Sequence, residues 1–229
     1  MAFLEESVYF GVLVSVSTYA LGLWLQGRWK SPLCNPLIIS ILATVGVLLA
    51  GNIDYNAYYA GAQHLSYLLT PATVCLAIPL YEKLQLLKRN WKAILAGICA
   101  GVVTSLLCVL ATAALFGMSH LDYVTLLPKS ITTAIGMGVS QELGGNVTIT
   151  VAVIAITGVV GNAIAPTVCR VFRIREPIAR GIAIGTASHA IGTTRAMEMG
   201  EVEGAMSSLS IAVAGLLTVV GASVFAQFY

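Results

Sequence analysis

Charged residues are scarce in this sequence: 10% of its 229 residues are Asp, Glu, Lys or Arg, whereas a soluble domain has about 25%. Hydrophobic residues make up 58% of the chain, and the mean hydropathy is +0.88. No stretch is both long and polar enough to form a soluble domain. The net charge is +2 and no basic stripe is present, which argues against a nucleic-acid-binding protein. The composition predicts an integral membrane protein.

Enzyme and metal motifs are also missing. The chain contains no GxSxG, HExxH, CxxC or Walker sequence. Its three histidines lie far apart, and its five cysteines are scattered through apolar segments without metal-ligand spacing. We therefore expect no enzyme activity, no metal and no cofactor, and we interpret the cysteines as small apolar side chains within helices.

Long apolar runs are abundant, and each is close to the length of about 20 residues that crosses a bilayer as a helix. We expect an all-α integral membrane protein with one transmembrane domain over residues 1–229, about six full spans and two discontinuous or re-entrant segments. Glu5 and Glu6 stand where a secretory signal would have positive charge, so the first run is interpreted as a retained helix. The six expected spans are 7–26, 35–51, 68–82, 93–117, 147–169 and 205–228.

Basic residues alternate between loops and so indicate the orientation. Arg28 and Lys30 follow the first span, and basic clusters follow the third span at 83–92 and the 147–169 span at 170–180. The loops at 52–67 and 118–124 contain no Lys or Arg. Because Lys and Arg favour the cytoplasmic side, we expect these two loops and the N-terminus outside.

The apolar segment 125–143 contains Pro128, Lys129, a Ser/Thr run and glycines. The chain is expected outside near Asp122 and inside near Arg173, so it crosses an odd number of times between them. The 147–169 span accounts for one crossing. We therefore predict that 125–143 returns to the outer side as a re-entrant hairpin, sheltered by other helices. The alternative is a plain span, which places one basic loop on the wrong side.

A second segment, 178–199, has the same character and contains GTASHAIGTTR. It begins inside. If it turns back, the C-terminus lies outside; if it spans, the C-terminus lies inside, and the loop charges leave both open. The first possibility gives two hairpins that enter from opposite sides, each followed by a long helix, as in the inverted repeats of many secondary transporters.

Polar side chains within these two segments form the candidate substrate site. A charge near the bilayer centre costs about 2.5–3.5 kcal/mol, so a retained charge usually has a function. Lys129 either pairs with an anionic substrate or extends to the outer interface. The candidate substrate-binding residues are Lys129, Ser130, Thr132, Thr133, Thr186, Ser188, His189, Thr193 and Arg195.

His189 and Arg195 each have two interpretations. His189 either binds substrate or transfers a coupled proton, since its pKa lies near neutrality; alternatively, it is a neutral histidine hydrogen-bonded between helices. Arg195 either clamps a substrate carboxylate or pairs with Glu198, which lies three residues further on the same helical face. The expected site is an anion pocket between the tips of the two segments, with Lys129, His189 and Arg195 as its cations.

Other polar residues are expected to support the structure. Asn35 precedes Pro36 and is predicted to cap the second helix. Asn162 is mid-helix and could hydrogen-bond across to a hairpin, and Glu203 is predicted to cap the last helix. The small-residue motifs GICAG at 97–101 and GIAIG at 181–185 predict close helix contacts.

Three stretches, LLPKSITTAIGMGV, GTASHAIGTTRAMEM and EGAMSSLSIAVAG, resemble the signature blocks of the LrgB/CidB family of bacterial inner-membrane proteins. NPL at 35–37 and PLYEKL at 79–84 also fit, so the resemblance covers nearly the whole chain. Ala134 stands where the family pattern has Pro; if that Pro sets the break, Gly136 and Gly138 would set it here. The matching positions are Lys129, Ser130, Thr132, Thr133, Thr186, Ser188, His189, Thr193, Glu203, Ser207 and Ser208.

The resemblance implies two functions. The family is described as antiholin-like, regulating murein hydrolase activity and cell lysis with a small LrgA/CidA-type membrane partner. A related chloroplast protein exports glycolate and glycerate, and bacterial members are linked to pyruvate uptake. We expect a cell-membrane carrier of small 2-oxo or 2-hydroxy monocarboxylates that works by alternating access, with a proton or sodium ion as coupling ion and a homo-oligomer as a candidate assembly. The alternative is the antiholin-like regulator.

Overall fold

The computed structural model describes residues 9–29, 35–68, 71, 74–75 and 77–229, and these contain helices and turns but no strand. The expected all-α class is confirmed. Glu5, Glu6, Lys30 and Cys34 lie outside the described residues. The chain forms two compact units, Met1–Cys75 and Leu76–Tyr229, which are described separately.

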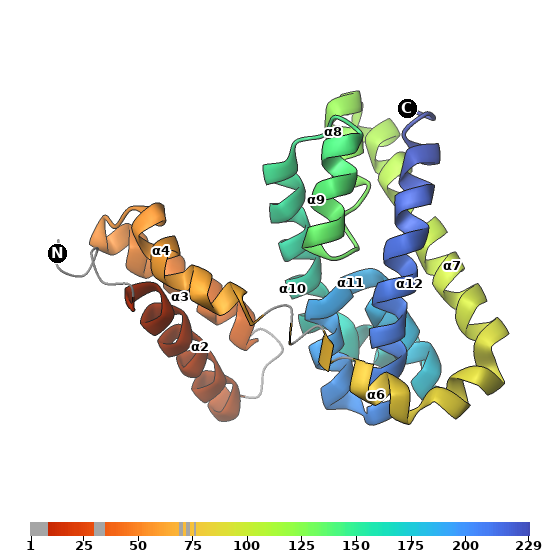
Figure 1. Cartoon of the computed structure of the whole chain (residues 1–229), viewed down its shortest axis with the longest axis horizontal. Coiled ribbons are helices and arrows are strands. Elements are labelled where there is room, and N and C mark those ends of the chain that lie inside the picture. Colours follow the sequence, from red (N-terminus) through yellow and green to blue (C-terminus); the bar gives the residue numbers. More distant parts are fainter. Residues whose placement is uncertain (1–8, 30–34, 69–70, 72–73, 76) are drawn as a thin grey trace. The chain divides into compact units, whose positions relative to one another are not determined.

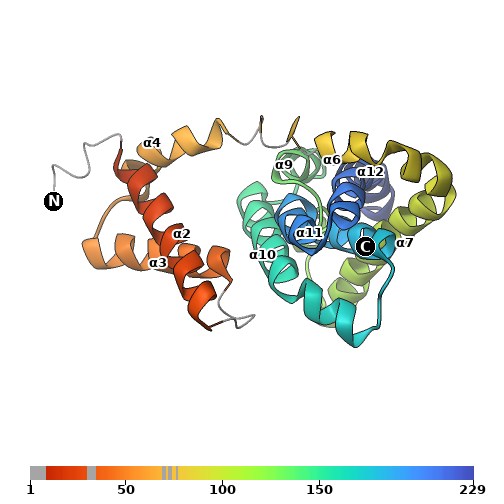
Figure 2. The ribbon, with the colours of Figure 1, turned by 90° about the horizontal axis from the view of Figure 1, so that it is seen from below.

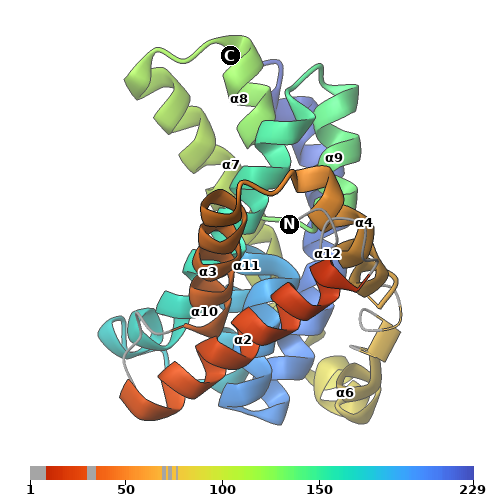
Figure 3. The ribbon, with the colours of Figure 1, turned by 90° about the vertical axis from the view of Figure 1, so that its left-hand side faces the viewer.

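In the first unit, helix α2 packs on both α3 and α4 (Figure 3). A Cβ atom at Gly11 would lie 2.1 Å from the carbonyl oxygen of Tyr58, and one at Gly22 would lie 2.7 Å from that of Pro36. The Ser15 and Tyr58 hydroxyls are 2.8 Å apart. Small and hydroxyl residues therefore allow close approach, as is typical of helices in membranes. The three helices are α2 (Phe10–Trp29), α3 (Pro36–Gly51) and α4 (Tyr55–Ser66).

The predicted N-cap at Asn35 is confirmed. Its side chain accepts a hydrogen bond of 2.9 Å from the backbone N–H of Leu37, and Pro36 occupies the first helical turn. Asp54 caps α4 in the same way, through the N–H of Asn56. Both caps satisfy backbone donors that a helix start leaves free.

The described part of the second unit consists of helices joined by turns, and α11 lies at its centre (Figures 1 and 2). This helix packs against α7, α10 and α12, and its packing against α12 is the most extensive. The helices are α6 (Ala77–Glu82), α7 (Leu84–Phe116), α8 (His120–Leu126), α9 (Thr133–Glu142), α10 (Val147–Val171), α11 (Pro177–Met199) and α12 (Glu201–Phe225).

Four helices within the described residues are long and apolar enough to cross a membrane. The expected number of six is not confirmed. α3 has 16 residues, and the expected span at 68–82 lies partly outside the described residues, with Ala77–Glu82 as its described helix. The four are Phe10–Arg28, Leu84–Phe116, Val147–Val171 and Glu201–Phe225.

The segment expected to be broken at 125–143 contains the end of α8, a run of turns at 127–132 and then α9, and the chain folds back on itself there. We call this fold the α8–α9 hairpin. Thr125, near the end of α8, accepts a 2.8 Å hydrogen bond at its hydroxyl from the N–H of Asn146. The Thr150 hydroxyl lies 2.8 Å from the Thr125 carbonyl and 2.7 Å from the hydroxyl of Ser140, near the end of α9. Both ends of the segment therefore meet at the start of α10. A Cβ at Gly136 would lie 3.6 Å from the Pro128 carbonyl oxygen, so the turns at 127–132 lead back along α9 and the tip lies where they join it, at Thr132.

The break in this hairpin lies before Ala134 and not at the glycines after it. Gly136 and Gly138 are inside α9, so the expectation that they set the break is wrong. α8 instead ends at Leu126, two residues before Pro128, which has no backbone N–H to donate the next helical hydrogen bond. Gly136 has a packing function, because a Cβ there would lie 2.4 Å from the Ile154 side chain.

α11 is also broken, at His189, where φ is 42° and ψ is −142°. Its first arm approaches the start of α12, since a Cβ at Gly181 would lie 2.4 Å from the Glu203 carbonyl oxygen. Its second arm returns to the same place, since a Cβ at Gly204 would lie 2.8 Å from the Met197 side chain. The two arms therefore form a second hairpin with His189 at its tip.

The two hairpins have their bases at opposite ends of the second unit (Figure 1). The Tyr229 hydroxyl donates to the Met118 carbonyl at 2.8 Å, which joins the C-terminus to the base of the α8–α9 hairpin. Lys83 pairs with Glu201 at 2.8 Å, which joins the start of α7 to the base of the α11 hairpin. The basic residues at 83–92 and 170–180 therefore lie at the α11 end.

Candidate functional site

The tips of the two hairpins contact the same two helices. On α7, the Ser105 hydroxyl is 3.0 Å from that of Ser130 in the first tip. One turn away on α7, a Cβ at Gly101 would lie 2.9 Å from the Thr186 hydroxyl in the second hairpin. On α10, Ile154 packs against Gly136 and its carbonyl oxygen is 3.0 Å from Nε2 of His189. We call Ser105, Ser130, Ile154, Thr186 and His189 the hairpin-tip cluster.

His189 is a buried residue, 3% exposed, that joins α11 to α10. Because a carbonyl oxygen only accepts, Nε2 must donate to Ile154 and must therefore be protonated. The ring lies against Gly158, where a Cβ would be 2.7 Å from Cε1. The interhelical hydrogen bond expected as the alternative for His189 is thus present. With Nε2 protonated, the ring is neutral when Nδ1 has no proton and positively charged when Nδ1 is also protonated.

Hydroxyl groups fix the backbone on both sides of the break. The Thr193 hydroxyl donates to the His189 carbonyl at 2.9 Å and is 2.7 Å from the Ser207 hydroxyl on α12. Ser188 packs on α10, since a Cβ at Gly161 would lie 1.7 Å from its hydroxyl. Residues before and after His189 are therefore held by different helices, which explains how its unusual backbone conformation persists.

The predicted residues of the first hairpin lie together at its tip. Lys129 is half-buried, and its ammonium group donates to the Ser130 hydroxyl at 3.1 Å. Thr132 occupies the N-cap position of α9 and Thr133 is the first residue of that helix. A helix N-terminus with free backbone N–H groups and a lysine is suited to an anion.

Arg195 lies on the second arm of α11 and is already paired. Its guanidinium group forms an ion pair with Glu198, and its Nε donates to the Asn162 carbonyl at 3.3 Å. Asn162 in turn donates to the Ile191 carbonyl at 2.7 Å, which confirms its expected hydrogen bond to a hairpin. Among the described residues, no ion pair or hydrogen bond joins Lys129, His189 and Arg195 to one another.

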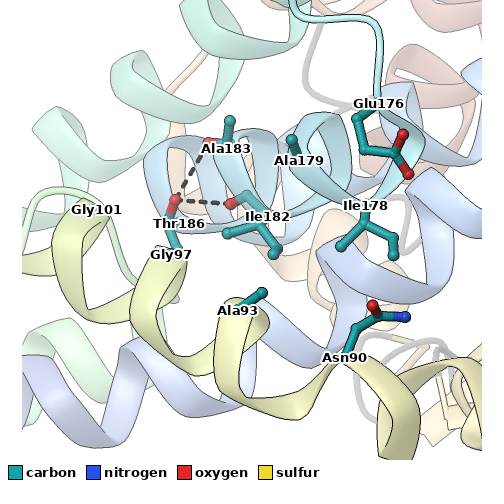
Figure 4. A pocket seen from close by; sticks show the side chains of 10 residues that line it. All are labelled: Asn90, Ala93, Gly97, Gly101, Glu176, Ile178, Ala179, Ile182, Ala183 and Thr186. Carbon is teal, nitrogen blue, oxygen red and sulfur yellow. Dashed lines mark hydrogen bonds between the residues drawn. The ribbon is translucent and has the colours of Figure 1, made fainter.

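A cavity of about 510 Å³ lies between α7 and the first arm of α11 (Figure 4). Asn90 and Glu176 lie toward one end of the cavity, and Thr186 and Gly101 lie toward the other. The cavity therefore connects the basic end of the unit with the hairpin-tip cluster. Its lining residues are Asn90, Ala93, Gly97, Gly101, Glu176, Ile178, Ala179, Ile182, Ala183 and Thr186.

Glycine residues of the two small-residue motifs allow α11 to pack closely on α7 and α12. In GIAIG, a Cβ at Gly185 would lie 2.5 Å from the Ser207 carbonyl oxygen on α12. In GICAG, a Cβ at Gly97 would lie 3.3 Å from Ile182 on α11. The close contacts predicted from both motifs are confirmed.

Ser105 is a site residue that was not predicted from the sequence. The available signal was a hydroxyl four residues after Gly101, on the same face of an apolar helix.

Two ion pairs close the base of the α11 hairpin. Lys83 pairs with Glu201, which raises the pKa of the lysine above its usual value. Arg180 approaches the carboxylate of Glu203 at 3.5 Å, and Glu203 is only 5% exposed. The helix cap expected from Glu203 is not formed through a side-chain hydrogen bond. Its carboxylate instead joins the start of α11 to the start of α12.

Comparison with known proteins finds similarity over nearly the whole chain. The model of the LrgB-like family matches residues 15–228. The chain is 36% identical over 221 residues to a protein named antiholin-like protein LrgB from Bacillus cereus (strain B4264), covering 96% of each. A protein of the same name from Bacillus anthracis (strain CDC 684 / NRRL 3495) has the same identity and coverage. No solved structure matches the chain.

Proposed function

The chain belongs to the LrgB-like family, and we propose on that premise that it is an antiholin-like protein of the bacterial cell membrane. In this proposal it moderates murein hydrolase activity and cell lysis together with a small LrgA/CidA-type membrane partner. The observation that supports it is the name of relatives that match 96% of the chain at 36% identity.

An antiholin acts through contact with a pore-forming partner, so lipid-facing helix surfaces would determine its activity. Ala96, Ala100 and Thr104 are exposed at a spacing of four residues on α7 and offer such a surface. The test is lysis of cells that express a holin-type partner with and without this protein. Ala100→Leu should weaken the protection from lysis, whereas Thr186→Val, inside the protein, should leave it intact. The opposite pattern would contradict action through helix contacts.

The geometry favours a second function, a carrier of small 2-oxo or 2-hydroxy monocarboxylates. The specific observation is that hairpins based at opposite ends of one unit bring their tips to adjacent turns of α7 and to the same residue, Ile154, of α10. Secondary transporters with inverted repeats place the substrate at such a junction and expose it alternately to each side. The proposed transmembrane arrangement has both hairpins re-entering the membrane.

In the carrier, the carboxylate would bind at the start of α9, where the helix dipole and Lys129 favour negative charge. Hydroxyls of the second hairpin would complete the site, and a proton on Nδ1 of His189 or a sodium ion would be coupled to transport. Arg195 remains a candidate that would have to exchange Glu198 for substrate. The proposed binding residues are Lys129, Ser130, Thr132, Thr133, Thr186, Ser188, His189, Thr193 and Arg195.

Uptake of labelled pyruvate, glycolate and glycerate into proteoliposomes, with and without the small partner, tests the carrier. Lys129→Gln should reduce uptake at least roughly tenfold, which corresponds to about 1.4 kcal/mol of lost anion binding. Lys88→Gln removes the same charge from an exposed position at the basic end and is the matched control. Equal uptake by both variants would remove Lys129 from the site, and no uptake by the unaltered protein would reject the carrier.

For orientation, the positive-inside rule assigns the basic end of the second unit to the cytoplasm. The base of the α8–α9 hairpin and the C-terminus would then lie outside. We keep the N-terminus outside as a prediction from the loop charges.

A further inference from the structure

A second cavity, of about 320 Å³, lies at the turn between α10 and α11 and is lined by four arginines. None of the four belongs to the hairpin-tip cluster or to the cavity that leads to it. The lining residues are Pro166, Cys169, Arg170, Arg173, Ile174, Arg175, Arg180 and Met199.

The turn that carries these arginines is well defined by hydrogen bonds. Arg173 has a positive φ of 55°, and the next N–H, that of Ile174, donates to the Cys169 carbonyl at 2.8 Å. This pattern closes the end of α10. Nε of Arg180 donates to the Ile174 carbonyl at 2.8 Å, so the start of α11 is fixed to the same turn. The cationic side chains therefore project from a fixed backbone.

The positive charge of this cavity is largely uncompensated. The ion pairs among the described residues are Lys83–Glu201, Arg180–Glu203 and Arg195–Glu198. Of the four arginines, only Arg180 takes part, at 3.5 Å. Glu176, the acidic residue next to Arg175, lines the other cavity. Like charges that share one cavity repel one another, and a bound anion would relieve that repulsion.

We propose that this cavity binds the phosphate group of an acidic phospholipid. Guanidinium groups present paired N–H donors that match two phosphate oxygens. Basic pockets between membrane helices on the cytoplasmic side bind lipid headgroups in this way. Val171 and Phe172, which lie between the arginines in the sequence, are 67% and 73% exposed. This helix end thus presents apolar side chains beside the cations, and that combination fits a lipid better than a soluble phosphate.

The lipid would hold the base of the α11 hairpin to the end of α10. This inference requires only that α10 crosses the membrane, so it is independent of the choice between antiholin and carrier. Its failure would leave both proposed functions untouched.

The test is lipid retention by the purified full chain. Protein is assembled in nanodiscs of phosphatidylcholine with a minor fraction of cardiolipin or phosphatidylglycerol, released into detergent, and examined by native mass spectrometry. Arg170→Gln/Arg175→Gln removes two exposed cations from the cavity and leaves Arg180 and the hydrogen-bonded turn in place. Lys88→Gln/Arg89→Gln removes two exposed cations from the same end outside the cavity and is the matched control.

We expect the cavity variant to bind acidic lipid roughly 25-fold more weakly, since each of the two interfacial cations contributes about a factor of five. The control should retain lipid as the unaltered protein does, and both variants should remain monodisperse and helical by circular dichroism. Equal losses in the two variants would indicate unspecific attraction and overturn the proposal. Retention unchanged in the cavity variant, or thermal stabilisation by inorganic phosphate alone that requires Arg170 and Arg175, would also overturn it.

Discussion

His189 shows at the residue scale how one side chain and one backbone torsion combine. Its φ of 42° favours glycine, while its ring donates to the Ile154 carbonyl. His189→Ala loses the hydrogen bond and keeps the strained backbone, whereas His189→Gly loses the hydrogen bond and relieves the strain. We expect the Ala variant to be less stable than the Gly variant by about 1 kcal/mol. Unfolding in mixed detergent measures the difference, and a Gly variant below the Ala variant would contradict it.

The Thr193–Ser207 hydrogen bond can be measured by a double-mutant cycle. Both side chains are fully buried and their hydroxyls are 2.7 Å apart. Thr193→Val and Ser207→Ala should each destabilise the protein, and the double variant should lose less than their sum by about 0.6 kcal/mol, the usual coupling in membranes. Thr112→Val is the control, because that exposed hydroxyl bonds only within its own helix. Strict additivity would show that the two hydroxyls do not interact.

The residue types in the sequence predicted the role of a side chain better than they predicted its hydrogen-bond partner. Asn35 before Pro36 contains its whole signal within three residues, so its cap was predictable. Arg195 and Glu198 are three residues apart, so their pairing could be foreseen as one of two alternatives. The partners of His189 and Ser130 lie 35 and 25 residues away. Such contacts depend on how helices pack, and a single sequence does not contain that information locally.

At the scale of elements, the packing of the first arm of α11 on α12 depends on glycine. A Cβ at Gly185 would lie 2.5 Å from the Ser207 carbonyl oxygen, a backbone atom that cannot move independently. Gly185→Ala should therefore lower the free energy of unfolding by about 1–3 kcal/mol through overpacking. Gly138→Ala is the matched control, because nothing lies within 4 Å of its Cβ. That variant should be neutral or slightly stabilising, since alanine favours a helix.

Breaks in helices were predictable as regions but not as residues. Pro128 and the glycine- and threonine-rich composition of 125–143 and 178–199 indicated that neither segment forms an uninterrupted helix. The actual positions, the turn at 127–132 and the single residue His189, depend on tertiary contacts. At His189 these are the contacts with Ile154, Thr193 and the helices around them, and they override the local preference for helix.

At the scale of the whole molecule, the proposed topology rests on both hairpins returning to the side from which they came. The Thr125–Asn146 hydrogen bond joins the two ends of the first hairpin, and the approach of Gly181 and Met197 to α12 joins those of the second. Single cysteines in a cysteine-free background would report the side on which each end lies. We expect Asp122→Cys and Gln141→Cys in intact cells to react with an impermeant maleimide.

Cysteines at the other end should be protected in the same cells. Arg175→Cys and Glu198→Cys flank the second hairpin, are exposed in the structure, and should react only after the membrane is made permeable. The decisive comparison is within each pair, because a hairpin places both its ends on one side and a span places them on opposite sides. If Asp122→Cys and Gln141→Cys differ in their reaction with the maleimide in intact cells, the α8–α9 segment crosses the membrane. The positive-inside rule could then no longer place both basic clusters, at 83–92 and 170–180, in the cytoplasm, although they share one end of the unit. The carrier proposal would then lose the opposed hairpins on which alternating access depends, whereas the antiholin proposal, which depends on the outer faces of the helices, would remain.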